Sequence, residues 1–599
     1  MQSFDRINSL HLMVGSFQAV LAYGLYEAAD HGVWPATHAA AFIPLFMLML
    51  FFPFAFYCAN NALTVRRWLI SFAIALLAAS IGLYQGLTVS GWASGGTVME
   101  PNWSPASLGD YMVPALILSL ALFLLVPALA LYQGSWRVDY RRWMLSLHQN
   151  AQLLLQASLV LGLFWALLLT AAALFGLIDL HFMQNLIERS WFSIPLSVLV
   201  FSHGVSLAVR NHNVVDYLSE RAGQLCSWLY PMAAILGLGF VLSWLVQGLD
   251  TLLATGHAAN LLLWFATLSL LLLNMANQGG VQSSQSAGWL RWLALLGTLA
   301  LLPMTLVAAY ALGLRIDQYG LTPTRIWAAF VNLVLMLMVL GYLLHSVQQV
   351  RDASRSWIAS TNAFTAVVVV LGILLMLAGP LDPRRISVAS QIARLQHDST
   401  VDAVALIGFL ARDGGRFGTE ALWQLAKQEG VAGSLEAERA AMAQRALERP
   451  DNQVGDADAV IANLPIFPAG VSLPRGLQEQ LATYPELSDC SVDLAATNAC
   501  LIWQLKLRPE GPDEYVLLSR RPPVAHPFGV LWQQTGDGDW DSLGRIDLNT
   551  IGCPPRSGTQ ILFEALIKGQ VEMQVKQQRD LMVNGVRIPT TTWQQDNCN

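Results

Sequence analysis

Long apolar stretches separated by short polar connections make up the first 380 residues. A helix crosses a bilayer with about 20 mostly apolar residues. By that length the pattern predicts eleven membrane spans. Their approximate limits are 9–29, 38–60, 67–89, 112–132, 152–179, 191–210, 226–247, 257–275, 288–313, 324–347 and 360–380. We interpret the first as a retained anchor, because it is too long for a secretory signal peptide and lacks the small-residue cleavage pattern.

The pattern changes after position 380. Asp382 followed by Pro383 is typical of a helix start. Polar and apolar positions then predict helices at about 383–396, 400–412, 419–429, 434–448 and 474–483. Thr419 is the expected cap of the third of these helices.

From Cys500 onward the alternation favours strands instead of helices. The segments 500–508 and 514–521 predict one strand pair, and 528–534 with 541–547 predict another. Asn584-Gly585 between apolar flanks predicts a hairpin. We therefore expect a mainly α protein, in which a polytopic transmembrane bundle of about eleven spans precedes a soluble α+β domain with a small antiparallel sheet.

Three regions follow from these patterns. We expect residues 1–380 to form the transmembrane helical domain, 381–455 an extracytoplasmic helical segment, and 456–599 an extracytoplasmic α+β domain with disulfides. The positions of the arginines and cysteines are the reason for the extracytoplasmic side and for the disulfides.

Composition supports the same division. The 599 residues are 54% hydrophobic and 12% charged, whereas soluble domains are about 25% charged. Residues after 380 hold 27 of the 40 acidic and 20 of the 34 basic side chains. This acidic excess argues against a nucleic-acid partner, which would need a basic surface.

Arginine positions predict the orientation, because cytoplasmic loops carry an excess of positive charge. With a cytoplasmic N-terminus, eleven arginines fall inside and three, Arg189, Arg315 and Arg325, fall outside. The eleven are Arg6, Arg66, Arg67, Arg137, Arg141, Arg142, Arg210, Arg221, Arg291, Arg351 and Arg355. An odd number of spans then leaves the C-terminal domain on the opposite side of the membrane.

Cysteine usage bears on the compartment of that domain. Of six cysteines, Cys490, Cys500, Cys553 and Cys598 lie in the C-terminal part. An even number in a compact domain is typical of an oxidising compartment. Four cysteines allow three pairings, of which we favour Cys490–Cys500 with Cys553–Cys598. Zinc is the alternative, but the close CxxC spacing typical of its sites is absent.

A short polar hairpin, residues 315–325, interrupts the apolar pattern between the ninth and tenth spans. Gly320 permits the turn, and Thr322 and Pro323 favour a helix start there. Arg315 and Arg325 place positive charge on the outer face, which suggests an anionic partner. That partner is an acidic patch of the C-terminal part, a lipid phosphate or an anionic substrate. The simpler interpretation is a structural turn in which Asp317 pairs with one arginine.

The same stretch carries a resemblance. Tyr319-Gly-Leu-Thr322 followed by Arg325, and Asp413-Gly-Gly-Arg-Phe-Gly418 with Glu420-Ala-Leu422, are similar to an uncharacterised family of bacterial polytopic membrane proteins, the domain of unknown function 4153. The resemblance implies a multi-pass bacterial membrane protein, which we expect in the inner membrane. In a Gram-negative bacterium the arginine count and the odd number of spans then predict a periplasmic C-terminal domain. The resemblance implies no established activity. Relatives often carry a run of acidic residues that could bind calcium. At the corresponding positions, 503–510, this chain has the sequence WQLKLRPE and lacks that run. The resemblance therefore implies no calcium site in this chain.

Other candidate chemistry is sparse. His203 within the sixth span and Arg210 lie seven residues apart on one helix face, which permits a proton relay or a structural hydrogen bond. Glu27, Asp30 and His31 predict a polar cluster at the outer end of the first span. Asp537, Asp539 and Asp541 alternate as in a calcium loop, but the glycine and glutamate that such a loop requires are absent. No catalytic, phosphate-binding or dinucleotide motif is present, so we predict no cofactor and no metal.

Three functions remain open on this basis. The absence of catalytic motifs favours a non-enzymatic protein that senses the envelope or binds another envelope protein, with membrane lipids as further partners. A transporter of a small or lipid-like solute would need a path lined by His203. A membrane enzyme would use Arg315 and Arg325 to hold a lipid-linked anionic substrate and Asp317 as a base.

Overall fold

The computed structural model describes most of the helical part of the chain and most predicted strands. The described residues are 2–60, 62–89, 108–132, 139–178, 180–210, 212–249, 258–276, 288–351, 357–397, 403–428, 435–448, 461, 464–468, 471–482, 500–506, 513–519, 528–534, 540–547, 581–583 and 586–588. They divide into two compact units, Met1–Leu447 and Glu448–Asn599. The helices predicted between 381 and 448 belong to the first unit.

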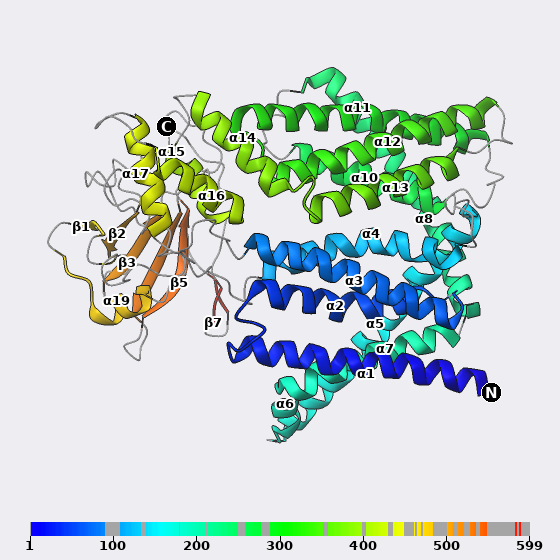
Figure 1. The fold of residues 1–599 in the computed structure, drawn as a ribbon. Coiled ribbons are helices and arrows are strands. Elements are labelled where there is room, and N and C mark those ends of the chain that lie inside the picture. The colour runs from blue at the N-terminus through cyan, green and yellow to red at the C-terminus, as the bar shows by residue number, and fades with distance from the viewer. Residues whose placement is uncertain are drawn as a thin grey trace. The chain divides into compact units, whose positions relative to one another are not determined.

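All secondary structure described in the first unit is helical (Figure 1). Its first half consists of α1 (Gln2–Asp30), α2 (Ala39–Cys58), α3 (Thr64–Val89), η1 (Leu108–Asp110), α4 (Met112–Leu131), α5 (Tyr140–Gly176), α6 (Phe182–Ile187) and α7 (Ser190–Arg210). Its second half consists of α8 (His212–Gln247), α10 (Ala258–Ala276), α11 (Gly288–Tyr319), α12 (Pro323–Arg351), α13 (Ile358–Leu377), α14 (Pro383–His397), α15 (Ala403–Arg412), α16 (Gly415–Ala426) and α17 (Leu435–Glu448).

Ten helices in the described part of the chain have the length and apolar composition of a membrane span: α2, α3, α4, α5, α7, α8, α10, α11, α12 and α13. Each coincides with a predicted span, so the multi-pass membrane architecture is confirmed. The first predicted span is a helix too, but α1 is not among the ten. His11, Ser16 and Gln18 lower its hydropathy, although α1 is 29 residues long and packs through Val14 into a buried core.

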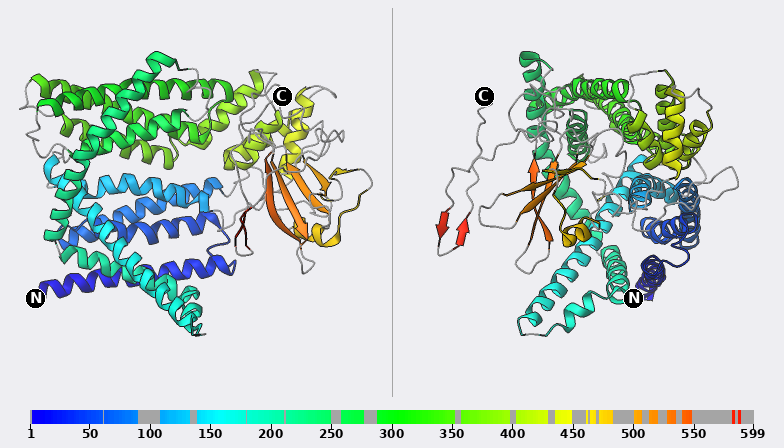
Figure 2. Two further views of the ribbon diagram at one scale, coloured as in Figure 1. Left: turned by 180° about the vertical axis from the view of Figure 1, so that it is seen from behind. Right: turned by 90° about the vertical axis from the view of Figure 1, so that its left-hand side faces the viewer.

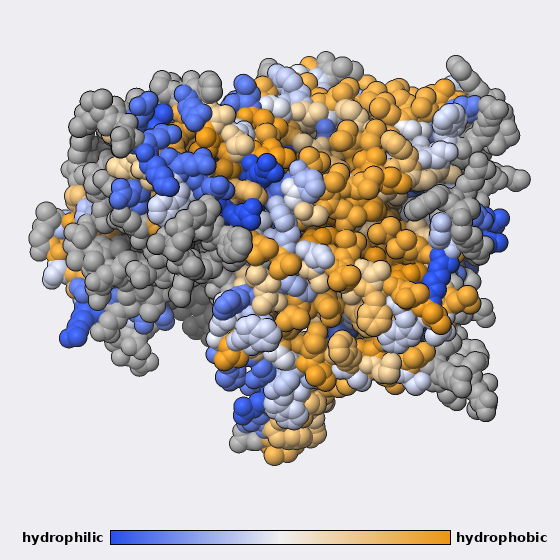
Figure 3. Space-filling view, in the orientation of Figure 1, coloured by the Kyte–Doolittle hydropathy of each residue, from blue (hydrophilic) through white to orange (hydrophobic). Residues whose placement is uncertain are grey.

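In the described part of the bundle, three large buried cores join its helices, and a smaller one lies between α4 and α5. One joins α2, α3 and α4 to α13, one joins α8, α10, α11 and α12, and one joins α1, α2 and α3 to α5 and α7. The left view of Figure 2 shows the helices of both halves of the first unit from behind. Large aliphatic side chains remain exposed on the outside, among them Leu76, Leu116 and Leu167, and hydrophobic residues cover the helical body in Figure 3. Exposed aliphatic surface of this kind is what a lipid environment accommodates.

The helices after the last span have a core of their own. Apolar residues of α14, α15, α16 and α17, including Leu395, Leu410 and Leu422, pack together. Pro383 is the first residue of α14, as predicted. Thr419 is not the cap of α16, because that helix begins at Gly415 with Gly414 as its N-cap. The Thr419 hydroxyl donates instead to the Gly415 carbonyl, at 3.2 Å.

The described residues of the second unit form a five-stranded mixed sheet, a helix and a separate strand pair. Its elements are β1 (Ile466–Phe467), α19 (Arg475–Ala482), β2 (Cys500–Leu505), β3 (Glu514–Ser519), β4 (Phe528–Gln534) and β5 (Trp540–Asp547), with a separate pair β6 (Leu581–Val583) and β7 (Val586–Ile588). Both predicted strand pairs and the terminal hairpin strands are present. The sheet is mixed because β1 adds in parallel to β2. Leu477 and Leu481 of α19 pack against one face.

Candidate functional site

The predicted hairpin is shorter than its sequence suggested, because α11 continues to Tyr319. Arg315, Asp317 and Tyr319 therefore lie on the last turns of a helix. Gly320 has φ +72° and its N–H donates to the Ile316 carbonyl at 2.8 Å, which is a left-handed helix end. The next helix, α12, begins at Pro323, and the Thr322 hydroxyl accepts from the Arg325 N–H at 3.4 Å, as an N-cap does.

The predicted pairing of Asp317 with an arginine is not formed. In the described part of the chain no ion pair joins Asp317 to Arg315 or Arg325, and Asp317 is exposed. Residues two apart on a helix point in different directions, which separates Arg315 from Asp317. Both arginines lie instead against the Tyr319 ring, with guanidinium carbons 5.8 and 5.4 Å from its centroid.

The helix that follows the last span, α14, is docked on this turn by polar side chains. The Ser387 hydroxyl donates to the Leu321 carbonyl at 2.8 Å. The Gln391 amide donates to the Tyr319 and Leu321 carbonyls, each at 3.0 Å. Arg394 Nη2 donates to the Gln318 carbonyl at 2.8 Å. These acceptors include the last carbonyls of α11, which have no partner within their own helix.

The start of α14 is also tied to the body, at the end of α3. The Asp382 carboxylate is buried and accepts from the Tyr84 hydroxyl at 2.7 Å and from the Arg384 N–H at 2.8 Å. The second contact confirms Asp382 as the N-cap of α14. Gln85 donates to the Leu377 carbonyl at the end of α13, at 2.7 Å. The residues that leave the last span are therefore held at both α3 and the α11–α12 turn.

His203 and Arg210 both lie on α7, as predicted. The His203 side chain is exposed, whereas its neighbours Ser202 and Ser206 are buried. The side chain of Arg210 is outside the described part. Among the described side chains no hydrogen bond to the His203 imidazole is formed. The proton relay through His203 and Arg210 is untested and stays a prediction.

The structure brings together a buried polar cluster that the sequence analysis missed. Arg67 of α3 is 7% exposed and His11 of α1 is fully buried. Arg67 donates through Nε to the Phe56 carbonyl at 2.6 Å and through Nη2 to His11 Nε2 at 2.8 Å. Ser202 connects α7, because its hydroxyl donates to the His11 carbonyl at 2.7 Å and accepts from the Tyr57 hydroxyl at 3.2 Å.

The end of α2 explains how this guanidinium is tolerated without a carboxylate. Phe56 lies in the last turn of α2, where backbone carbonyls lack helical partners and the helix dipole is negative. Arg67 supplies a donor and a positive charge to that end, and its guanidinium carbon lies 3.9 Å from the Phe56 ring centroid. Asn150 donates to the neighbouring Cys58 carbonyl at 2.9 Å. The cluster therefore has the chemistry of a buried helix C-cap.

A second network joins four helices of the body. The Tyr342 hydroxyl, fully buried on α12, donates to Asn362 Oδ1 of α13 at 2.6 Å. The Asn362 amide nitrogen in turn contacts the Tyr140 hydroxyl of α5 and Asn274 Oδ1 of α10, each at 2.9 Å. Single polar residues inside apolar runs were the sequence signal for both networks, as with His11 in the first and Asn362 in the second.

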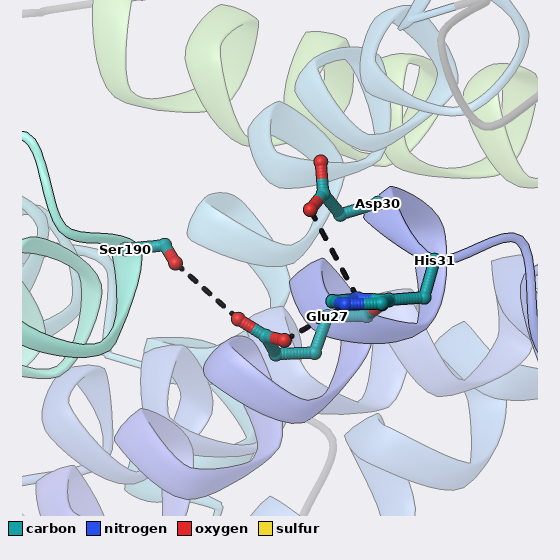
Figure 4. Close-up of polar contacts among 4 residues, drawn as sticks. All are labelled: Glu27, Asp30, His31 and Ser190. Atoms are coloured by element: carbon teal, nitrogen blue, oxygen red, sulfur yellow. Dashed lines mark hydrogen bonds and ion pairs between the residues drawn. The ribbon is translucent and has the colours of Figure 1, made fainter.

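The polar cluster predicted at the end of the first span is formed (Figure 4). His31 Nδ1 lies 3.4 Å from a Glu27 carboxylate oxygen and 3.9 Å from Asp30. Ser190 of α7 donates to the other Glu27 oxygen at 3.3 Å. His31 and Asp30 are about 60% exposed, so these contacts are those of a solvated helix end.

The cysteine predictions fall mostly outside the described residues. Cys490, Cys553 and Cys598 lie there, and Cys500 begins β2 with its side chain undescribed. The disulfide pairing therefore stays a prediction. Within the described part, no three His, Cys, Asp or Glu side chains gather as metal ligands would.

Comparison with known proteins adds one finding. The family model "Domain of unknown function (DUF4153)" matches residues 19–415, about two thirds of the chain. The chain belongs to this family. No curated protein and no solved structure matches the chain.

The DUF4153 match includes the candidate membrane spans and the first helices after them. The match runs past the last span, through α14 and α15, and ends at the start of α16. The docked helix α14 and its contacts with the α11–α12 turn therefore lie inside the family's domain. The second unit lies outside the match.

Proposed function

We propose that this DUF4153 protein is a non-enzymatic protein of the bacterial inner membrane, whose periplasmic C-terminal domain senses the envelope or binds another envelope protein. The observation that carries the proposal is the docking of α14 on the α11–α12 turn. A change that reaches the extramembrane helices would be transmitted to α11 and α12 through Ser387, Gln391 and Arg394, which contact their turn directly.

The contacts at the two ends of α3 support the proposal that the N-terminus and α14 lie on opposite sides of the membrane. His11, near the start of α1, contacts Arg67 at the beginning of α3. Asp382, before α14, contacts Tyr84 near its end. At about 1.5 Å per residue, the 17 residues between Arg67 and Tyr84 extend about 25 Å, close to the thickness of the hydrocarbon core.

The distribution of arginines supports one of the two possible orientations of the chain in the membrane. The arginine excess favours a cytoplasmic N-terminus, which puts α14 and the chain that follows it in the periplasm. Four cysteines in the C-terminal part agree with an oxidising compartment. The pairs Cys490–Cys500 and Cys553–Cys598 belong to the same proposal.

Cysteine labelling in whole cells tests the orientation. Gln396→Cys places a thiol on α14 and Arg142→Cys places one near the start of α5, both at exposed positions. In a background without the native cysteines, a membrane-impermeant maleimide should label Gln396→Cys in intact cells and Arg142→Cys only after permeabilisation. The reverse pattern would reject the proposed topology.

Hydrogen exchange tests the coupling. Gln391→Leu removes the amide that holds the Tyr319 and Leu321 carbonyls, whereas Gln396→Leu changes an exposed glutamine on the same helix. Amides of residues 315–325 should exchange faster in Gln391→Leu than in Gln396→Leu. Equal protection in the two variants would mean that α14 does not control the turn.

Photo-crosslinking tests the partner. A photoreactive residue in place of Trp423, a partly exposed side chain of α16, should give a crosslinked band in growing cells. The same residue in place of Leu76, on the lipid-facing side of α3, is the control. Identical band patterns at the two positions would count against a specific partner at the extramembrane helices.

One observation favours a membrane enzyme as the second candidate. Asp317 lacks an ion pair with either arginine, which leaves its carboxylate available as a base beside cationic groups. Such an enzyme would act on a lipid-linked anionic substrate. Cells carrying Asp317→Asn should then accumulate that lipid in extracts analysed by mass spectrometry. An unchanged set of anionic lipids would exclude this alternative.

A further inference from the structure

We propose that Arg315, Arg325 and Arg394 form a binding site for the phosphate of an anionic phospholipid headgroup. The site goes beyond the proposed function, because it holds whichever side of the membrane the turn faces.

Three guanidinium groups meet at one helix end. Arg315 and Arg325 share the Tyr319 ring, and Arg325 and Arg394 donate to carbonyls only two residues apart, those of Gly320 and Gln318. They come from three elements, namely α11, α12 and α14. The docking of α14 therefore completes the cluster, since it adds the third positive charge.

Nearby negative groups of the protein balance only part of the positive charge of the three arginines. Asp317 lies on the same turn but pairs with neither Arg315 nor Arg325, and no ion pair to Arg394 is formed in the described part. The C-terminus of α11 supplies about half a negative charge. Three positive charges against Asp317 and this helix end leave an excess of about one and a half. By contrast, Arg384 at the start of α14 has a carboxylate partner, Asp110, at 3.7 Å.

The cluster has donors to spare for a phosphate. Arg325 donates through Nη1 to the Gly320 carbonyl at 2.6 Å. Arg394 donates to the Gln318 carbonyl at 2.8 Å and to Gln391 Oε1 at 3.4 Å. Each guanidinium carries five donors in a planar fork that matches phosphate oxygens. The carbonyl bonds fix the orientation of Arg325 and Arg394, and most donors of the three guanidinium groups are left for a ligand.

The position of the cluster selects a lipid. Tyr319 is the last residue of one candidate span and Pro323 the first of the next, so the turn lies where the hydrocarbon core gives way to headgroups. Tyr319 is 53% exposed, and aromatic residues with one polar end are enriched at this level. A phosphodiester is the anion found at highest concentration there.

Binding of short-chain lipids to the purified full-length protein tests the site. The probes are dihexanoyl phosphatidylglycerol, dihexanoyl phosphatidylcholine, which has the same chains and no net charge, and inorganic phosphate. We expect phosphatidylglycerol to bind in preference to both. Each of Arg315→Gln, Arg325→Gln and Arg394→Gln should weaken its binding about fivefold, the effect typical of one basic residue near an anionic membrane.

Two further variants keep the test decisive if an arginine variant fails to fold. Asp317→Asn removes the nearest carboxylate and no arginine contact, so it should strengthen phosphatidylglycerol binding about twofold to fivefold. Arg142→Gln changes an exposed arginine near the start of α5 and should leave the affinity unchanged.

Four results would overturn the proposal. They are equal binding of phosphatidylcholine, equal binding of inorganic phosphate, an affinity in Asp317→Asn no higher than in the wild type, and equal weakening in Arg142→Gln and the three site variants. The second result would indicate a free phosphate site instead of a lipid site. None of these results bears on the side of the membrane, which the Gln396→Cys labelling decides alone.

Discussion

Replacing Arg67 by methionine is the most informative perturbation of the membrane body. Methionine keeps an unbranched apolar stem of similar length but removes every donor and the charge. The Phe56 carbonyl and His11 Nε2, which Arg67 contacts at 2.6 and 2.8 Å, then lose their partner inside a buried cluster. If the cluster is a structural helix cap, this loss should appear as reduced stability.

The expected magnitude follows from opposing effects. A buried acceptor left unpaired costs about 1–3 kcal/mol, and two are left here. Loss of the cation from the Phe56 ring and the α2 C-terminus removes about 0.5–2 kcal/mol more. Against this, methionine avoids the desolvation of a buried cation, which costs several kcal/mol. We expect Arg67→Met to lower the free energy of unfolding by about 2–3 kcal/mol.

The assay is unfolding of the purified protein in mixed micelles as the fraction of sodium dodecyl sulfate rises, followed by tryptophan fluorescence. Arg142→Met is the matched control. Arg142 is 67% exposed and contacts only Asp139, at 3.5 Å, among the described residues. Its replacement should change the free energy by less than about 0.5 kcal/mol.

A double-mutant cycle that combines Arg67→Met with His11→Leu tests the contact between Arg67 and His11. In the double variant neither partner of the Arg67–His11 bond remains to be left unpaired. Its destabilisation should therefore fall short of the sum of the single effects by about 1–2 kcal/mol. Additive effects, or an Arg67→Met variant as stable as Arg142→Met, would show that Arg67 does not bridge α1 and the end of α2 in the way described.

Three other predictions concern the turn, the Asn362 network and the cysteines. Gly320→Ala should destabilise the protein by more than about 1–2 kcal/mol because of its positive φ and because an added Cβ would lie 2.8 Å from atoms of Arg394 and Gln391. Gly313→Ala, where a Cβ meets nothing within 4 Å, should stabilise α11 by about 0.5–1 kcal/mol, and the opposite order would contradict the turn geometry. Asn362→Leu leaves the buried Tyr342 hydroxyl without its acceptor and should cost about 1–3 kcal/mol in the same unfolding assay; no loss would mean that the network does not contribute to stability. Non-reducing peptide mapping should find Cys490 joined to Cys500 and Cys553 to Cys598, and alkylation of all four thiols without reductant would reject the disulfides.

The sequence predicted the spans well because apolar length is a strong local signal. Ten of the eleven predicted spans are helices with the composition of a membrane span. The strand pairs of the second unit were also predictable, since alternation and turn residues act locally. Local signals were weaker at helix ends. Thr419 has the chemistry of a cap, but Gly414 takes that position, because α16 begins at Gly415 and not at the predicted 419.

Contacts between distant segments were not predictable. The sequence indicated the 315–325 stretch, but not that α11 would include Arg315 and Asp317, nor that Gln391, about 70 residues later, would hold its carbonyls. His203 drew attention as an intramembrane histidine and is exposed, while His11, near the start of the chain, is fully buried. A polar residue inside an apolar run signals a special environment, but the partner depends on which helices pack together.

Several arginines in the described part donate to carbonyls at helix ends, and a comparison of two such ends separates a structural cap from the proposed ligand site. Arg67 and the α11–α12 turn both place guanidinium groups on the last carbonyls of a helix. At Arg67 a single buried cation meets a single helix end, which leaves an excess of only about half a positive charge. At the turn, three cations from α11, α12 and α14 meet one helix end and one unpaired carboxylate. Arg325 and Arg394 donate to carbonyls of that end, and Asp317 offsets only one of the three charges. This larger excess of positive charge is the reason for proposing an anionic phospholipid at the turn and none at Arg67.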